Sequence, residues 1–147
     1  MHIHPFERPY LEPCVALFLT VFTRPPWNED WAMTTAAARF TDLLHTPGFY
    51  GVIAIDATEM VGFAAGYTEH WARTQHFYLK ELCVAPQHQR QGIGTTLLQT
   101  ICTELAARGV ERISLLTSRV SPAEDFYRKR GFYVSQKMVM MGKSLKE

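Results

Sequence analysis

The chain has 147 residues, 47% of them hydrophobic, and its 15 lysines and arginines nearly balance its 14 aspartates and glutamates. A chain of this length can bury roughly 70% of its unfolded surface in one domain, so its core needs neither disulfides nor a metal. The near-neutral charge also argues against a general nucleic-acid binder, which would carry an excess of basic residues to neutralise phosphates.

The three cysteines are far apart in the sequence and odd in number, which argues against a disulfide scaffold. The N-terminus has no basic region that leads into an apolar stretch, and the apolar run Cys14–Phe22 is far too short to span a bilayer. We therefore expect residues 1–147 to form one soluble, cytoplasmic domain that binds neither nucleic acid nor membrane.

The apolar pattern of the first half of the chain predicts a strand, two helices and a hairpin. Apolar residues at helical spacing indicate the helices, and two β-branched or small apolar runs on either side of Asp56–Glu59 indicate the hairpin. In chain order, we expect a strand over 2–6, helices over 11–22 and about 28–44, and strands over 51–55 and 60–67.

The second half of the chain begins with the clearest strand pattern and ends with further strands. Ser121 and Glu124 fit a capping box, Pro122 stands at the first helical position, and Gly131 ends that helix. In chain order, we expect a strand over 77–84, a helix over about 94–108, a strand over 112–117, a helix from 121, and one or two closing strands over 132–143. The order βααβββαβαβ(β) predicts an α/β fold with a mixed sheet.

The segment Glu81–Thr95 predicts an anion-binding turn. A strand ends there, and Gly92 and Gly94 open an amphipathic helix after a short polar loop. The first amides of a helix lack intrahelical acceptors, and glycines let a phosphate approach the backbone closely. The segment lacks the lysine of a P-loop and the third glycine of a dinucleotide-binding turn, so neither of these nucleotide motifs fits.

Three motifs in the chain resemble those of the GNAT superfamily of acyl-CoA-dependent N-acyltransferases. Gln89–Gly94 is similar to the signature Gln/Arg-x-x-Gly-x-Gly/Ala, and Val84–Pro86 supplies the Val-x-Pro element that typically precedes it. Further along, Ala123–Phe132 (Ala-x-x-Phe-Tyr-x-x-x-Gly-Phe) resembles the second motif of the family. The resemblance covers nearly the whole chain and implies a single GNAT-like domain, with a mostly antiparallel sheet flanked by helices.

The resemblance implies acetyl-CoA as the cosubstrate and no metal. Main-chain amides of the glycine-containing loop would hold the coenzyme pyrophosphate, and pantetheine would fill a gap where the preceding strand splays from strand 112–117. The coenzyme-binding residues implied are Leu82, Cys83, Val84, Gln89, Arg90, Gln91, Gly92, Ile93, Gly94 and Thr95. Many relatives carry an Asn where this chain has Val120, with Ser121 beside it, so a coenzyme contact at this position stays open.

By the same resemblance, Tyr127 is the general acid that protonates the departing thiolate, the alternative being an aromatic side chain that packs in the core. Glu81 is the candidate general base. On an alternating strand it shares a face with Leu79 and Cys83, so partial burial would raise its pKa. The alternative is a salt bridge, with neighbours of Lys80 or with an arginine across the sheet, and a β-bulge in this strand would change the face. Nothing supports Cys83 as a nucleophile, and we expect its amide, or that of Val84, to polarise the thioester oxygen.

Two segments that choose the acceptor in relatives, 25–31 and 67–71, mix acidic and aromatic residues. Such a wall suits a cationic amine through charge and cation–π contact. The candidate substrate-binding residues are Trp27, Glu29, Trp31 and Trp71. The alternative is that Glu29 and Asp30 favour the start of a helix and that Trp27 and Trp31 close the core.

These features together predict an N-acetyltransferase that moves an acetyl group from acetyl-CoA to a primary amine of a cationic small molecule. The amine would attack directly within a ternary complex. Two alternatives stay open: a catalytically silent acyl-CoA-binding regulatory domain, and a protein or peptide N-acetyltransferase. The apolar segment Met138–Met141 fits a homodimer contact and core packing equally well.

Overall fold

The computed structural model describes residues 1–146 and divides the chain into two compact units, Met1–Leu115 and the residues from Leu116 onward. Of the elements found in residues 1–146, the first unit contains all the strands and three α-helices, and the second contains one α-helix. Among the described residues, no helix combines the length and the apolar character that a bilayer-spanning segment needs.

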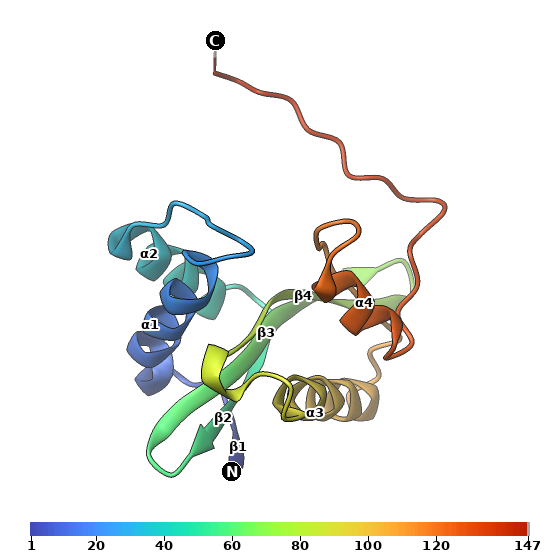
Figure 1. Ribbon diagram of the computed structural model, residues 1–147. Helices are drawn as coiled ribbons and strands as arrows, with labels where there is room; N and C mark the ends of the chain where they lie inside the picture. The colour runs from blue at the N-terminus through green and yellow to red at the C-terminus, as the bar shows by residue number, and fades with distance from the viewer. Residues whose placement is uncertain (147) are drawn as a thin grey trace. The chain divides into compact units, whose positions relative to one another are not determined.

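The first unit is built on a five-stranded sheet, as Figure 1 shows. Its strands are β1 (His2–Pro5), β2 (Phe49–Asp56), β3 (Glu59–Trp71), β4 (Thr74–Val84) and β5 (Arg112–Ser114). They lie side by side in chain order, and every neighbouring pair is antiparallel except β4 and β5. The predicted mixed and mostly antiparallel sheet is therefore confirmed.

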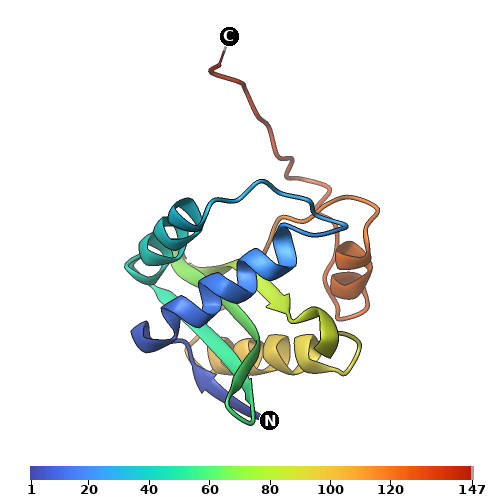
Figure 2. The ribbon, with the colours of Figure 1, turned by 60° about the vertical axis from the view of Figure 1, so that its left-hand side comes forward.

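Helices cover both faces of this sheet (Figures 1 and 2). On one face lie α1 (Leu11–Phe22) and α2 (Met33–Leu44), and on the other lies α3 (Ile93–Ala107). Two short 3₁₀ turns, η1 (Arg8–Tyr10) and η2 (Pro86–His88), precede α1 and α3.

Three buried aromatic rings join α1 and α2 to the sheet. The ring of Phe40 on α2 makes edge-on contacts with Phe18 on α1 and Phe63 on β3, at centroid distances of 5.1 and 5.5 Å. All three side chains are almost fully buried, and edge-on contact is the geometry that aromatic pairs prefer. This packing fixes α2 over strands β3 and β4, the position from which it reaches the candidate site.

The second helix begins later than the sequence predicts, at Met33 and not at Asn28. Asn28 has a φ of +49°, in the left-handed region, and Ala32 is extended with a ψ of 151°. Neither conformation continues a right-handed helix, so the stretch between them is a loop. The tryptophan and the acidic residues of this loop therefore precede α2 and are not part of it.

Strand β4 contains a bulge at Lys80. Across the ladder Ala65 pairs with Glu81 whereas Gly66 pairs with Leu79, so Lys80 is one extra residue on β4. An extra residue reverses the alternation of side chains on that strand. The expectation that Glu81 shares a face with Leu79 is therefore wrong, although Glu81 and Cys83 do share the face covered by α1 and α2.

The parallel pairing between β4 and β5 is short. It joins His76–Tyr78 to Arg112–Ser114, so β5 ends three residues before the predicted limit. Within the described residues, Leu79–Val84 makes no ladder on this side. The ladder between β4 and β5 thus ends just before the bulge in β4.

The second unit contains α4 (Pro122–Arg128), which begins where the capping signals predict. The predicted closing strands over 132–143 are wrong: residues 129–146 contain no helix or strand. A strand exists only where a neighbouring backbone completes its hydrogen bonds, and the described residues form no ladder with this segment. The side chains of Met138–Met141 are largely exposed.

Candidate active site

The buried carboxylate of Glu81 is the centre of the candidate site in the first unit. Only 7% of this residue is exposed, and its Oε1 accepts a hydrogen bond from Nε of Arg39 at 2.6 Å. Burial raises the pKa of Glu81 above its ordinary 4.5, while the positive charge and hydrogen bond of Arg39 oppose the rise. A carboxyl with this balance can exchange a proton with a neighbouring base closer to neutral pH than an exposed glutamate can.

Arg39 comes from α2 and is held from a second side by an aromatic ring. Its guanidinium carbon lies 5.4 Å from the ring centroid of Trp31, and Nε1 of Trp31 donates to Oε1 of Glu29 at 2.7 Å. We call Glu29, Trp31, Arg39 and Glu81 the cation cluster. Two acidic groups, one aromatic face and one cation thus meet at the end of the loop that precedes α2.

Tyr78 extends the cation cluster along β4. The bulge places Tyr78 and Glu81 on the same face, and the Tyr78 ring lies 5.8 Å from that of Tyr67 on β3. Burial raises the pKa of Tyr78, and the charges of Arg39 and Glu81 act on it in opposite directions. A phenol close to both members of the ion pair is available as a further hydrogen-bonding group.

Glu29, Trp31 and Glu81, which the sequence pattern indicates separately, are brought together in the structure through Arg39. The salt bridge expected as the alternative to a free base does form, although the arginine comes from a helix and not from a neighbouring strand. Sequence reasoning missed Arg39 and Tyr78. The available signal for Arg39 was that it is the only basic residue between Met33 and Leu44.

Trp27 and Trp71, the other two predicted substrate-binding residues, make their ring contacts with residues outside this cluster. The Trp27 ring packs at 5.4 Å against Phe22. Trp71 is 51% exposed and stacks at 5.3 Å on His76 near the turn that joins β3 and β4. Trp71 pairs with Thr74, and a rise of about 3.3 Å per strand residue puts this pair about 20 Å from Glu81.

The predicted anion-binding turn connects β4 to α3. Gly92 is the N-cap of α3 with a φ of +82°, Arg90 has a φ of +64°, and the Thr96 amide donates to the Gly92 carbonyl at 3.0 Å. Left-handed residues within such a turn direct successive amides into one concavity, and the positive end of the helix dipole lies there. A Cβ placed on Gly92 would meet no atom within 4 Å, so the space above this backbone is open to a ligand.

The side chain of Gln89 braces the turn. Gln89 donates through Nε2 to the carbonyl of Val84 at 3.1 Å and so ties the turn to the end of β4. Ile93 is buried in the core, whereas Arg90 and Gln91 are exposed. Gly94 and Thr95 follow Ile93 in the first turn of α3. This set of backbone amides and one exposed guanidinium, that of Arg90, fits the diphosphate of a coenzyme.

The strand before the turn carries Leu82, Cys83 and Val84, the residues predicted to lie along pantetheine. This stretch of β4 lies beyond the end of its ladder with β5. Burial raises the pKa of the Cys83 thiol well above 9.0, which keeps it protonated. A neutral, buried thiol behaves as a small apolar group, so Cys83 is not an activated nucleophile.

In the second unit, Tyr127 lies on α4 between two aromatic neighbours. Its ring makes edge-on contacts with Phe126 and Phe132 at 5.2 and 5.4 Å. The core-packing alternative thus has direct contacts in its support, and the acid role of Tyr127 stays a prediction.

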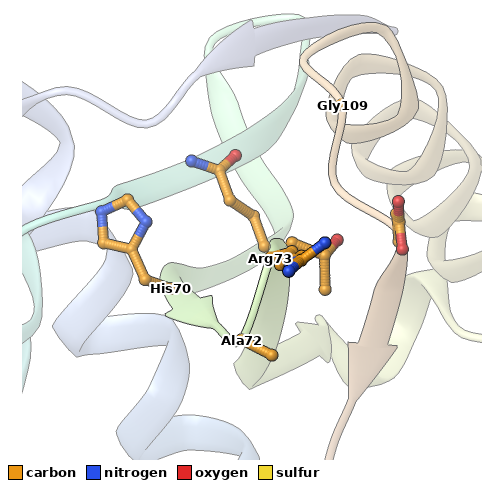
Figure 3. A pocket seen from close by; sticks show the side chains of 7 residues that line it. His70, Ala72, Arg73 and Gly109 are labelled. Carbon is orange, nitrogen blue, oxygen red and sulfur yellow. The ribbon is translucent and has the colours of Figure 1, made fainter.

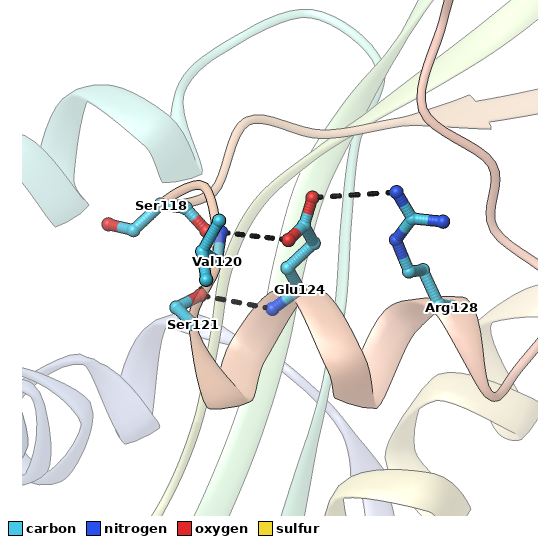
Figure 4. A network of polar contacts seen from close by, with 5 residues as sticks. All are labelled: Ser118, Val120, Ser121, Glu124 and Arg128. Atoms are coloured by element: carbon cyan, nitrogen blue, oxygen red, sulfur yellow. Dashed lines mark hydrogen bonds and ion pairs between the residues drawn. The ribbon is translucent and has the colours of Figure 1, made fainter.

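The N-terminus of α4 is closed by the network in Figure 4. Ser121 Oγ accepts from the Glu124 amide at 3.1 Å and donates to the Ser118 carbonyl at 2.6 Å, while Glu124 Oε2 accepts from the Val120 amide at 2.8 Å. Ser121 therefore has a structural role as a helix cap.

A surface pocket of about 460 Å³ lies elsewhere in the first unit, at the turn between β3 and β4 (Figure 3). His70, Arg73, Gln75 and Glu111 contribute its polar lining. None of the residues predicted to bind acceptor or coenzyme lines it. Among residues 1–146, no group of three or more His, Cys, Asp or Glu side chains is arranged to hold a metal ion.

Residues 16–132 match the model of the Acetyltransferase (GNAT) family. The matched range covers most of the chain and includes residues of both compact units, so the protein belongs to this family. It is accordingly an enzyme of the acyltransferase class. No curated protein matches the sequence.

Solved structures share the fold at low sequence identity. A probable acetyltransferase superposes with a TM-score of 0.82 at 18% identity, covering 100% of this chain and 99% of that one. An aminoglycoside acetyltransferase from an uncultured soil metagenomic sample, in complex with sisomicin, gives 0.76 at 22%, covering 99% and 96%. AAC(6')-Iy in complex with the bisubstrate analog CoA-S-monomethyl-acetylneamine gives 0.76 at 17%, covering 97% of each chain.

Proposed function

We propose that the protein transfers an acetyl group from acetyl-CoA to a primary amine of a small cationic molecule, by direct attack in a ternary complex. The observation that carries the proposal is the buried Glu81 carboxylate, on the strand that leads into the anion-binding turn, whose partner Arg39 also contacts the aromatic face of Trp31. A cationic amine needs both an anion to bind it and a base to deprotonate it, and Glu81 can supply both.

The turn from Gln89 to Thr95 is the proposed coenzyme site. Its left-handed Arg90 and Gly92 and the N-terminus of α3 offer backbone amides to a diphosphate. The edge of β4 from Leu82 to Val84, which lies beyond the ladder with β5, is the proposed place for the pantetheine arm, which would pair with strand backbone as an added strand does. When bound, acetyl-CoA supplies an activated acyl group as a thioester.

Glu81 is the proposed base. An amine acceptor is protonated at neutral pH and must lose a proton before its lone pair can attack a carbonyl carbon. Burial raises the pKa of Glu81, which brings the proton affinity of its carboxylate closer to that of the amine. Glu29 and Trp31 add charge and an aromatic face to the same site, which favours a cationic acceptor.

Tyr127 is the proposed acid, and the amide of Cys83 or Val84 the proposed donor to the developing oxyanion. A phenol with a pKa of about 10 is a suitable proton donor to a departing thiolate. Support for Tyr127 comes from its position in the second motif, which lies inside the range matched by the family. Support for the Cys83 and Val84 amides comes from their position on the stretch of β4 that lies beyond its ladder with β5.

The test is release of free coenzyme A thiol from acetyl-CoA with a panel of amines. The panel contains sisomicin, spermidine, uncharged glycinamide at alkaline pH, and a peptide with a free N-terminus. We expect release with the first two and little with the others. Release with the peptide alone would favour the peptide N-acetyltransferase, and tight acetyl-CoA binding without release would favour the silent acyl-CoA-binding domain.

A further inference from the structure

The positive group in the cation cluster is the guanidinium of Arg39, a side chain of the protein itself. The Arg39 Nε is 2.6 Å from Glu81 Oε1, and its guanidinium carbon is 5.4 Å from the Trp31 ring. A carboxylate and an aromatic face on two sides of one positive group are what a protein uses to bind an ammonium or guanidinium ligand. Arg39 thus stands where the positive group of a ligand would be recognised.

The two members of the ion pair differ in their access to water. The side chain of Arg39 is 34% exposed, whereas that of Glu81 is 7% exposed. An arginine stem is flexible and its head is stable in water, so Arg39 can turn outward without losing solvation. The carboxylate cannot follow, and once Arg39 leaves it requires another cation or a proton.

We propose that Arg39 is an internal competitor of the acceptor: its guanidinium occupies the subsite formed by Glu81 and Trp31, and a cationic amine binds by displacing it. The proposal rests on the proposed function and identifies Arg39 as a specificity-determining residue. A neutral amine is rejected because it brings no positive charge to replace the Arg39 guanidinium beside the Glu81 carboxylate.

The exchange also changes which proton can move. A guanidinium keeps its proton throughout the accessible pH range, so the Arg39–Glu81 pair is chemically inert. An ammonium group in the same place can pass one proton from its nitrogen to the Glu81 carboxylate. This transfer leaves a neutral amine with a free lone pair and a neutral carboxylic acid, and no other bond changes. Occupation by the acceptor therefore turns an inert ion pair into a nucleophile beside a protonated acid.

The test measures cation binding without acetyl-CoA, at mildly alkaline pH. In a Trp27→Phe, Trp71→Phe background, Trp31 is the only tryptophan, and its fluorescence reports a cation at its ring. The probe is ethylguanidinium. We expect its Kd to be at least about tenfold lower in Arg39→Ala than with Arg39 present, because the subsite is vacated. An equal Kd in the two proteins would overturn the proposal.

Two further variants test whether the effect is specific to the Arg39–Glu81 pair. Arg39→Met keeps the length and apolar stem of the side chain, so it should also bind ethylguanidinium more tightly even if Arg39→Ala folds poorly. Arg108→Ala removes an exposed guanidinium that also contacts a glutamate and an aromatic ring, and it should leave the Kd unchanged. Tighter binding in Arg108→Ala, or binding in Arg39→Met that survives a second Glu81→Gln change, would contradict the assignment.

The kinetics of acetyl transfer give an independent readout of the competitor role of Arg39. Arg39→Met should lower the KM for sisomicin at least about threefold and should lower the discrimination against glycinamide, while Arg39→Lys should stay close to the wild type. A rise in KM would overturn the competitor role. Because ethylguanidinium binding needs no acetyl-CoA, failure of the transfer assay and failure of this proposal are separate results.

Discussion

The Nε atom of Arg39 lies 2.6 Å from Oε1 of Glu81, a contact between residues 42 positions apart that joins helix α2 to the bulged strand β4. The carboxylate is buried and the guanidinium is partly exposed. Loss of one partner from a buried pair is much more disruptive than loss of a surface pair, because the remaining charge stays desolvated. The contact therefore ties the position of α2 to the ionisation of the candidate base.

Glu81 makes the stability of the protein depend on pH in a defined direction. Burial raises the pKa of Glu81 above 4.5, so the folded protein keeps this proton at pH values where the unfolded chain has lost it. The stability that Glu81 contributes is therefore complete below pH 4.5 and is lost as the pH rises through the folded pKa. We expect the free energy of urea unfolding, wild type minus Glu81→Gln, to fall across this range.

Glu104→Gln, which removes an exposed glutamate that also pairs with an arginine, is the control for the effect of the Glu-to-Gln substitution itself on urea unfolding. A Glu81→Gln difference that stays flat or increases would show that burial does not dominate the pKa of Glu81.

Gly92 and Gly109 stand at opposite ends of α3 and allow a matched test of the coenzyme site. Both have a left-handed φ, +82° and +88°, and a Cβ on either would meet no atom within 4 Å. Alanine at either position should therefore cost about 1 kcal/mol of stability through backbone strain alone. Only Gly92→Ala should also weaken acetyl-CoA binding, by at least about tenfold, because its Cβ enters the proposed phosphate space.

Isothermal titration with acetyl-CoA and urea unfolding measure the two effects separately. Equal losses of affinity in Gly92→Ala and Gly109→Ala would point to a general consequence of strain. Unchanged affinity in both would remove the turn from the coenzyme site.

The general-acid assignment predicts a specific defect in Tyr127→Phe. This change keeps the ring that packs on Phe126 and Phe132 and removes the hydroxyl. Turnover should fall by roughly 10²-fold or more, with acetyl-CoA affinity nearly intact. Tyr133→Phe, which alters an exposed tyrosine in the same unit, should have wild-type turnover. Wild-type-like turnover of Tyr127→Phe across the pH range would leave packing as the role of Tyr127.

Ser121 has a structural role that can be separated from coenzyme binding. Ser121→Ala removes the acceptor of the Glu124 amide and should destabilise α4 by about 1 kcal/mol. Hydrogen exchange at that amide should accelerate roughly fivefold, while Arg128→Ala, which removes only an exposed ion pair, should change it little. We expect acetyl-CoA affinity to be retained in Ser121→Ala, and a large loss would instead assign Ser121 to the coenzyme site.

Local patterns in the sequence predicted most of the fold. The periodicity of Leu11–Phe22 predicted α1 with its observed bounds, and the Ser121 cap predicted the start of α4. Features that depend on distant backbone were missed. The bulge at Lys80 is a property of the pairing between two strands, and one strand read alone gives the wrong face for Glu81. The closing strands failed for a related reason, since an apolar run does not specify the strand that must pair with it.

The sequence predicted individual residues of the candidate site but not how these residues are arranged. Residue type and position in the sequence indicate Glu81, Glu29 and Trp31, but only the packing of α2 on the sheet reveals that Arg39 connects them. Trp71 has the same composition-based argument as Trp31, yet the long hairpin carries it to the far end of the sheet. The chemical type of a side chain therefore indicates which residues are candidates, and the fold shows which of these candidates lie together.

The most direct test of the proposed mechanism is the pH dependence of kcat/KM for acetyl transfer to sisomicin, measured for the wild type and Glu81→Gln. A glutamate base predicts turnover in the wild type with an acidic limb, along which activity rises as the base loses its proton, and loss of that limb in Glu81→Gln. No transfer by the wild type at any pH, or the same acidic limb in both proteins, would contradict the mechanism.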